Sequence, residues 1–420
     1  MNNSLVTIDV DSDRLINELN HLATLSDCSE PPPAVTRVVF TETDLKARAY
    51  LRSLYEDAGL QVRVDPIGNT FARWIGSDDA LPAVATGSHT DAIPHAGMYD
   101  GTVGVLGGLE AIRALKRGGF SPRRSIELVM FTSEEPTRFG IGCTGSRSMA
   151  RAIAVDQLSQ LKDSSGDSYD VVRQRGGFTG SIDGVVLASG HYASFVEMHI
   201  EQGPELEADG IDIGVVTAIA APATYAFQVD GQGGHAGAVL MPRRKDALCA
   251  AAEMISAIES AARDSNSSDL VATVGELTVH PGAVNSIPSR VRFTLDIRDI
   301  DAANRDRVIS EIIKAAETIG ERRGVMVQVD CRNCDPPATS DNAILASITR
   351  ACQSSGVSHR PIVSRAYHDS LFMARISPVA MIFIPCRGGV SHRPDEYSSP
   401  QQIAKGVEVL ARSLAELSLL

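Results

Sequence analysis

Three short, nearly continuous apolar segments each end close to a histidine or a pair of acids, and this pattern strongly restricts the fold. The segments and the residues after them are Val84–Thr86 with His89, Ile126–Phe131 with Glu134 and Glu135, and Phe195–Met198 with His199. Helical patterns such as 102–117 lie between them. Continuous apolar strands between helices are typical of a mostly parallel sheet with helices on both faces. We therefore expect an α/β domain in which these polar residues meet beyond the carboxyl ends of the strands.

A different pattern interrupts this domain between residues 218 and 334. The expected strands and helices are Tyr225–Val229, a helix with Leu248–Ile258, strands Val271–Val279 and Val291–Ile297, a helix over Ala303–Ile319, and strand Val325–Val329. The order β-α-β-β-α-β predicts a smaller ferredoxin-like α+β domain. We accordingly assign residues 1–217 and 335–420 to the first domain and 218–334 to the second.

Composition excludes several classes of partner. The chain has 420 residues and a net charge of −13, so binding to nucleic acid or to an anionic membrane is not expected. No apolar run reaches the roughly 18 residues that a transmembrane helix needs. Residues Met1–Asp11 show neither the basic nor the apolar region of a signal peptide, which favours a cytoplasmic protein.

The polar residues after the strands fit a metal centre better together than singly. His89 can bind a cation while Asp91, two residues later, accepts its other ring N–H. Asp100 precedes Gly101 at a helix start and is either a helix cap or a carboxylate shared by two cations. Adjacent Glu134 and Glu135 repel each other unless cations are near, although a solvated loop would also explain them.

Two further histidines complete the pattern. His199 alone would more often be a core histidine, and His392, in the run Gly388–His392, would be a turn residue. Jointly, three histidines, two ligand carboxylates and one spare glutamate suit two cations such as Zn²⁺, Mn²⁺ or Co²⁺. A spare glutamate can take the proton of a water that attacks an amide-like carbonyl.

Several long strings resemble the aminoacylase-type dinuclear metallohydrolases, in the branch that holds the allantoate, N-carbamoyl-L-amino-acid and ureidoglycolate amidohydrolases. The strings are FTSEEPTRFGI (131–141), HIEQGPELE (199–207), DIGVVTAIAAPA (212–223), GGHAGAVLMP (233–242), SRAYHDSLFMARISP (364–378), MIFIPC (381–386) and EYSSP (396–400). They are most similar to the plant-type ureidoglycolate enzymes, and the resemblance runs from about residue 15 to 417.

The resemblance implies a role for each matching residue. One metal would be held by His89, Asp100 and His199, and the other by Asp100, Glu135 and His392, with Mn²⁺ favoured over Zn²⁺. Glu134 would be the general base and Asp91 the partner of His89. Substrate contacts would be Gln202, His235, Asn285, Arg298 and His368. The second domain would act as a lid and carry a homodimer contact, with His235 and the Asn285–Arg298 pair reaching the neighbouring subunit's site.

Arg298 and the resemblance together favour a small acidic ureido substrate. Arg298 lies on the strand face opposite Val291–Ile297, away from the core, and a guanidinium matches a carboxylate; a solvated strand arginine is the alternative. Tyr367 stands where allantoate- and carbamoyl-cleaving relatives have glycine, and a phenol there would shrink the pocket and donate a hydrogen bond, unless it only packs. Pro136 also matches the ureidoglycolate type.

These features favour conversion of (S)-ureidoglycolate to glyoxylate, ammonia and CO₂ in purine (allantoin) catabolism. Allantoate or N-carbamoyl-L-amino acids are the alternative substrates, and a non-catalytic binding protein is a remote alternative. Plant relatives enter the secretory pathway, so the endoplasmic reticulum is the alternative compartment if a leader has been removed.

Overall fold

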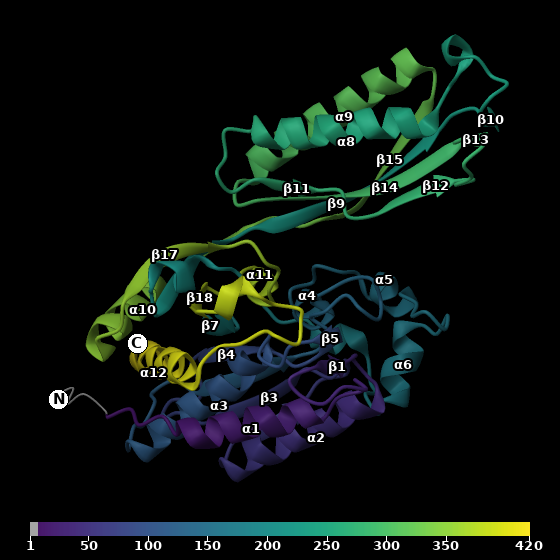
Figure 1. The fold of residues 1–420 in the computed structure, drawn as a ribbon. Helices are drawn as coiled ribbons and strands as arrows, with labels where there is room; N and C mark the ends of the chain where they lie inside the picture. Colours follow the sequence, from purple (N-terminus) through teal and green to yellow (C-terminus); the bar gives the residue numbers. More distant parts are fainter. Residues whose placement is uncertain (1–6) are drawn as a thin grey trace. The chain divides into compact units, whose positions relative to one another are not determined.

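The computed structural model describes residues 7–420 and divides into two compact units (Figure 1). Unit 1 takes in the described residues up to Thr217 together with Thr339–Ser364 and His368–Leu420, and unit 2 comprises Ala218–Ala338 and Arg365–Tyr367. The expected borders at 217/218 and 334/335 lie close to these, and the short segment Arg365–Tyr367 was not foreseen as part of unit 2. Residues 1–6, within the segment that lacks a signal-peptide pattern, lie outside the described residues.

A nine-stranded sheet forms the centre of unit 1, in the order β16-β8-β18-β7-β4-β6-β3-β2, with β17 paired to β8. Its strands are β2 (Gln61–Val64), β3 (Thr70–Trp74), β4 (Ala83–His89), β6 (Ile126–Phe131), β7 (Tyr192–Ile200), β8 (Ile213–Ile219), β16 (Ala338–Thr339), β17 (His359–Ser364) and β18 (Val379–Ile384). The middle strands β18, β7, β4 and β6 pair in parallel, whereas β8, β3 and β2 join antiparallel. The centre of the sheet is therefore a block of four parallel strands.

Helices cover both faces of this sheet, which confirms the expected α/β fold. The helices are α1 (Ser12–Thr24), α2 (Glu42–Asp57), α3 (Thr102–Arg117), α4 (Thr144–Met149), α5 (Val155–Gln160), α6 (Tyr169–Arg175), α7 (Glu205–Asp209), α10 (Asn342–Ser355), α11 (Ser370–Met373) and α12 (Pro400–Leu419). Short 3₁₀ turns occur at Ile182–Val185 and Arg387–Gly389, and β1 (Val35–Arg37) pairs with β5 (Ala92–Ala96).

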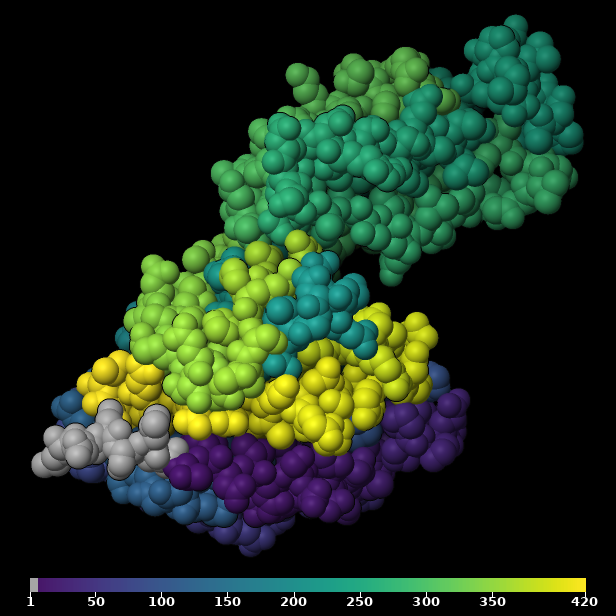
Figure 2. All heavy atoms as spheres, turned by 60° about the vertical axis from the view of Figure 1, so that its left-hand side comes forward, coloured from purple at the N-terminus to yellow at the C-terminus, as the bar shows by residue number. Residues whose placement is uncertain are grey.

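Residues of each central strand alternate between two buried clusters, because successive side chains of a strand point to opposite faces. Val84 belongs to the cluster under α1, α2, α3, α10 and α12, whereas its neighbours Ala83 and Ala85 face the cluster that includes Met149, Tyr169 and Met373. Both faces being apolar explains why β4, β6 and β18 are buried at every position. The C-terminal helix lies against the N-terminal one, purple beside yellow in Figure 2.

In unit 2 the strands of the main sheet and the two long helices follow the expected β-α-β-β-α-β order, except that the second strand is divided in two and a separate two-stranded sheet is inserted. Its elements are β9 (Ala221–Asp230), β10 (Gly234–His235), a 3₁₀ turn (Met241–Arg243), α8 (Ala247–Arg263), β11 (Val271–Thr273), β12 (Leu277–His280), β13 (Ser286–Ile287), β14 (Arg290–Asp299), α9 (Ala302–Arg323) and β15 (Met326–Cys334). The sheet order is β11-β14-β9-β15, with β12 also on β14. The aromatic rings of Phe227 and Phe293 stack in its core at 4.7 Å.

The single strand expected over Val271–Val279 is wrong. Thr273 pairs with Asp296 and Leu277 with Phe293, so four steps along this segment match three along β14. The extra residue breaks the ladder into β11 and β12, as a bulge does. Among residues 7–420, no helix is long and apolar enough to cross a membrane.

Candidate metal centre

The four parallel strands bring the predicted ligands to one edge of the sheet. His89 is the last residue of β4 and His199 the next to last of β7. Glu134 and Glu135 follow β6, and His392 follows β18. Neighbouring parallel strands end on the same side, so residues up to three hundred positions apart meet there.

Asp100 does not follow one of the four parallel strands but lies in the turn between β5 and α3. The structure makes Gly101, not Asp100, the cap residue of α3, and no side chain caps that helix. The sequence left two interpretations of Asp100, a helix cap or a shared carboxylate, and the structure excludes the helix cap. Gly101 has φ +64°, and a Cβ there would lie 2.5 Å from the His89 ring. Only glycine lets the chain pass this close to a candidate ligand.

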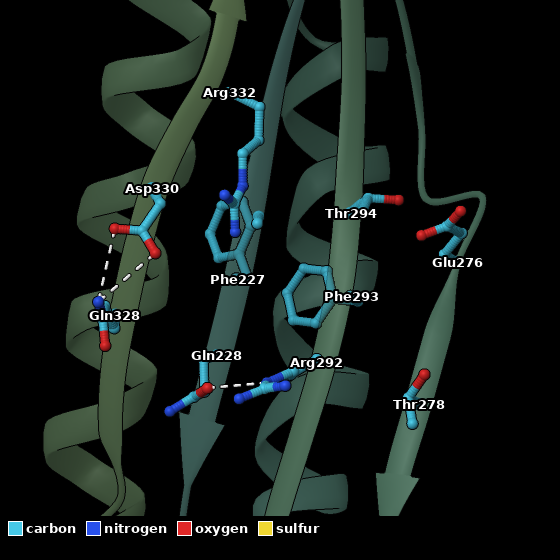
Figure 3. Close-up of a pocket in the computed structure, with 11 residues that line it drawn as sticks. Phe227, Gln228, Glu276, Thr278, Arg292, Phe293, Thr294, Gln328, Asp330 and Arg332 are labelled. Carbon is cyan, nitrogen blue, oxygen red and sulfur yellow. Dashed lines mark hydrogen bonds between the residues drawn. The ribbon is translucent and has the colours of Figure 1, made fainter. Parts of the chain in front are cut away.

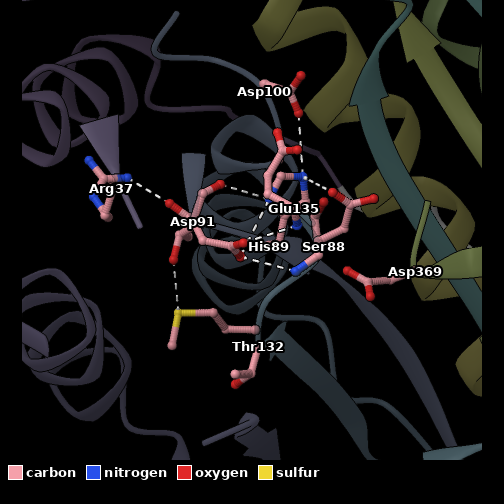
Figure 4. Close-up of polar contacts among 12 residues, drawn as sticks. Arg37, Ser88, His89, Asp91, Asp100, Thr132, Glu135 and Asp369 are labelled. Carbon is pink, nitrogen blue, oxygen red and sulfur yellow. Dashed lines mark hydrogen bonds and ion pairs between the residues drawn. The ribbon is translucent and has the colours of Figure 1, made fainter. Parts of the chain in front are cut away.

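Asp100 belongs to both groups of candidate ligands, and Figure 4 shows it close to His89 and Glu135. Its Oδ1 is 3.3 Å from Nε2 of His89 and 3.2 Å from Nε2 of His199. Its Oδ2 is 3.4 Å from Nε2 of His392, which is itself 3.4 Å from Oε1 of Glu135. Within each group the ligand atoms lie within 4.8 Å of one another. One carboxylate is thus placed to share its two oxygens between two cations.

Backbone carbonyls set the protonation of two imidazoles. Nδ1 of His89 lies 3.0 Å from the carbonyl oxygen of Asp91, and Nδ1 of His199 lies 2.9 Å from that of Ile200. A carbonyl can only accept, so each Nδ1 carries a proton and Nε2 is the ring nitrogen that is left to face Asp100 or a cation. The N–H of Gly101 donates to Nε2 of His199 at 3.1 Å, in agreement with this tautomer.

The side chain of Asp91 does something other than what the sequence suggested. Its carboxylate is 3.8 Å from Nδ1 of His89, beyond hydrogen-bond distance, and the carbonyl takes that N–H instead. The carboxylate oxygens accept the backbone N–H groups of Glu134, at 3.3 Å, and Glu135, at 3.0 Å. Asp91 therefore fixes the two glutamates after β6 as well as the histidine after β4.

Three further polar residues support this centre and were missed from the sequence. Ser391 and Glu396 bond to the Asp100 segment, and the Cys143 thiol lies 3.4 Å from Oε1 of Glu134. Ser391 is adjacent to His392, and Glu396 opens the string EYSSP, but neither position carried a local signal of its contacts. Gln202, a predicted substrate contact, donates its amide to Oδ2 of Asp100 at 2.6 Å and has φ +56°.

The pKa values of the candidate ligands and of Glu134 depend on one another. Burial alone would raise the pKa of Asp100, but hydrogen bonds from His199, His392 and His89 hold it well below its usual range. Burial raises the pKa of Glu134 well above its ordinary value, and it raises the pKa of Glu135 to about 7. The hydrogen bond to Asp100 raises the pKa of His392 to about 9.

This donor set fits two divalent cations. Three carboxylates, those of Asp100, Glu134 and Glu135, are buried close together, and those of Asp100 and Glu134 lie 3.3 Å and 3.7 Å from Nε2 of His89. Buried acids at such density need positive charge beside them. Imidazole nitrogens with free lone pairs and carboxylate oxygens are ligands for Zn²⁺ and Mn²⁺.

The other predicted substrate residues fall into the two units separately. In unit 1, His368 is buried, with its ring 4.7 Å from that of His199 and Nε2 2.9 Å from Ser364 Oγ. In unit 2, His235 and Asn285 lie at the same end of the β10–β13 pair, where the N–H of Ala236 donates to the Asn285 carbonyl.

Arg298 and Tyr367, also in unit 2, are already engaged. Arg298 lies on the face of β14 away from the core, where it bonds to the Asp296 carboxylate at 2.7 Å and to the Arg365 carbonyl at 3.0 Å. The Tyr367 hydroxyl donates to the carboxylate of Asp335. A substrate hydrogen bond from Tyr367 would therefore have to replace this contact.

A groove of about 450 Å³ on the open face of the unit 2 sheet is separate from these residues (Figure 3). Its lining includes Arg292, Arg332, Asp330 and Glu276, so cations and acids are balanced there. None of the predicted metal or substrate residues lines it.

Comparison with known proteins decides the family. Residues 85–416 match the peptidase family M20/M25/M40. The chain belongs to this family. It is 51% identical to a ureidoglycolate hydrolase of Arabidopsis thaliana over 98% of this chain and 88% of that protein. Crystal structures of AtUAH in complex with glyoxylate and with (S)-hydroxyglycine share 50% identity, cover 98% of both chains and superpose with a TM-score of 0.87.

Membership of the M20 family confirms that the chain is a hydrolase of the amidohydrolase type. Members of this family typically depend on a dinuclear metal site, and the two ligand groups around Asp100 are candidates for it.

Proposed function

We propose that this protein hydrolyses the ureido group of (S)-ureidoglycolate with two divalent cations held by His89, Asp100, Glu135, His199 and His392. The single observation that supports this most is the shared carboxylate of Asp100, with one oxygen toward each group of histidines. Identity of 51% to a ureidoglycolate hydrolase supports the choice of substrate. One molecule of water cleaves the ureido amide, which releases ammonia and CO₂ and leaves hydroxyglycine, and this breaks down to glyoxylate and ammonia.

When bound, the cations polarise the ureido carbonyl and lower the pKa of a water. Glu134 acts as the base for that water, because it is buried beside the ligands and its backbone is fixed by Asp91. The raised pKa of Glu134 suits it to take a proton and to deliver it to the leaving nitrogen. The thiol of Cys143, 3.4 Å from Oε1, limits the rotation of this carboxylate.

Unit 2 supplies groups for the acidic end of the substrate. Arg298 binds the carboxylate in place of Asp296, and His235 with Asn285 donates hydrogen bonds to the developing oxyanion. Gln202, His368 and Tyr367 complete the contacts. We further propose that Mn²⁺ is the native cation, that the protein is a homodimer in which His235 and the Asn285–Arg298 pair serve the neighbouring subunit, and that it acts in the cytoplasm.

The test is turnover by purified protein, stripped of metal and reconstituted with Mn²⁺ or Zn²⁺. Ureidoglycolate, allantoate, an N-carbamoyl-L-amino acid and a dipeptide are offered at equal concentration, and ammonia and glyoxylate are measured. We expect glyoxylate release from ureidoglycolate only with metal. Preferential turnover of allantoate or of the carbamoyl amino acid would contradict the substrate, and no turnover of any compound would contradict the enzymatic role.

A further inference from the structure

One member of the second group of candidate ligands, Asp100, Glu135 and His392, is held less firmly by the fold than the others. His392 is its most exposed member, with 47% of its side chain accessible, whereas His89 and His199 are at most 3% accessible. His392 also follows a glycine-rich turn rather than ending a strand, and it has φ +58°. Something other than the sheet must fix this ligand if a second cation is to bind.

Glu396 supplies one fixed point. It is 2% exposed, and its Oε1 accepts the backbone N–H groups of Tyr99, at 2.9 Å, and Asp100, at 3.1 Å. A Cβ on Gly97 would lie 2.4 Å from Cβ of Glu396, so glycine at 97 allows this approach. The segment after His392 is thereby tied to the backbone that carries the shared carboxylate, 296 residues away in the chain.

Ser391 supplies the second fixed point for the His392 turn. Its Oγ lies 2.9 Å from Oε2 of Glu396 and 2.9 Å from Oδ2 of Asp100, and the Gln202 amide reaches the same Oδ2. Oδ2 is the oxygen that faces His392, whereas Oδ1 faces His89 and His199. The hydroxyl of Ser391 thus touches only one half of the shared carboxylate.

We propose that Ser391 and Glu396 are positioning residues that orient Oδ2 of Asp100 and the His392 turn, so that the second cation binds. This inference rests on the proposed function. A carboxylate shared by two cations must keep both oxygens in place, and hydrogen bonds to ligands from outside the coordination sphere commonly contribute 10- to 100-fold in metal affinity, as an order of magnitude. Because the Ser391 hydroxyl contacts Oδ2 and not Oδ1, loss of this hydroxyl weakens one cation and not the other.

Three variants separate this role from support of the fold. Ser391→Ala removes one hydroxyl and leaves the bonds from Glu396 to the backbone. Glu396→Leu removes those bonds too. Glu396→Gln keeps an oxygen for the two N–H groups and offers its amide N–H to Ser391, whose hydroxyl still donates to Asp100. Glu110→Gln is the matched control, since Glu110 is a fully buried acid that bonds to Arg14, Arg117 and the N–H of Asp11, away from the centre.

Mn²⁺ bound per chain is measured by equilibrium dialysis and metal analysis over a range of free Mn²⁺, and unfolding is followed by circular dichroism. We expect two ions in the unaltered protein and in Glu396→Gln. In Ser391→Ala the weaker ion should lose about 10- to 100-fold in affinity while the tighter ion changes little. In Glu396→Leu the weaker ion should lose at least as much, because the Asp100 backbone is released as well. Glu110→Gln should unfold at a lower temperature and still bind two ions.

The proposal is overturned if Ser391→Ala binds both ions as the unaltered protein does, or if it weakens both equally. The proposed function survives either result, since the unaltered protein would still bind two ions and cleave ureidoglycolate. Only an unaltered protein that fails to bind a second ion overturns both.

Discussion

Replacement of Gly101 by alanine tests whether the backbone of the α3 turn is shaped around His89. The new Cβ would lie 2.5 Å from the imidazole, and ordinary contact begins at 3.4 Å, so the ring must move by 3.4 − 2.5 = 0.9 Å. Metal–ligand distances tolerate about 0.2 Å. We therefore expect Gly101→Ala to lose the cation on the His89 side and to reduce kcat by about 100-fold or more, since a misplacement near 1 Å costs that much.

Strain from the positive φ must be separated from this displacement. Gly119→Ala is the control, because Gly119 has φ +73° and a Cβ there meets nothing within 4 Å. Each variant should lose at least about 1 kcal/mol of unfolding free energy in urea, because an L-residue is disfavoured at positive φ. Gly101→Ala should lose more, since its ψ of −43° lies outside the left-handed region that L-residues can adopt. Only Gly101→Ala should lose Mn²⁺ in equilibrium dialysis. Full Mn²⁺ binding and normal turnover in Gly101→Ala would refute the reasoning that Gly101 makes room for a metal ligand.

Three other changes give distinct signatures. Glu134→Gln should lower kcat by about 100- to 10,000-fold with unchanged Mn²⁺ content, and metal loss instead would make Glu134 a ligand rather than a base. Arg298→Ala should raise KM for ureidoglycolate by roughly 10- to 100-fold, from about 1.5–3 kcal/mol of a charged hydrogen bond; an unchanged KM would remove Arg298 from the substrate site. Mn²⁺ binding should strengthen as pH rises from 7 to 9, because the pKa of His392, raised to about 9 by Asp100, keeps that ring protonated until a cation displaces the proton. Calorimetry at pH 8 in buffers of different ionisation heat measures the proton released, and none released would contradict this origin of the pKa.

Local patterns in the sequence were sufficient for the architecture. The apolar runs that became β4, β6 and β7 are buried on both faces, and this requirement appears directly as continuous hydrophobicity. The alternation over Val291–Ile297 likewise specified β14 and the outward face of Arg298. The single strand expected over Val271–Val279 was wrong, because one extra residue interrupts its pairing with β14. This interruption depends on the partner strand and is not visible in the segment itself.

The ligand candidates could also be named from the chain, because each follows an element whose end is visible in the pattern. Their division into two groups did not follow from these patterns, and only the resemblance to the family implied it. That β18, β7, β4 and β6 are neighbours, and that one oxygen of Asp100 faces His89 and the other His392, depends on strand order and on the path of the turn at Gly101.

Hydrogen bonds between distant segments were decided by the tertiary structure alone. The sequence placed Asp91 with His89, but the fold turned its carboxylate toward the backbone of Glu134 and Glu135. Ser391 and Glu396 carry no local signal, since their partners lie almost three hundred positions away. Hydrophobic periodicity records only which face of an element is buried, whereas a polar contact exists only once two separate elements have packed together.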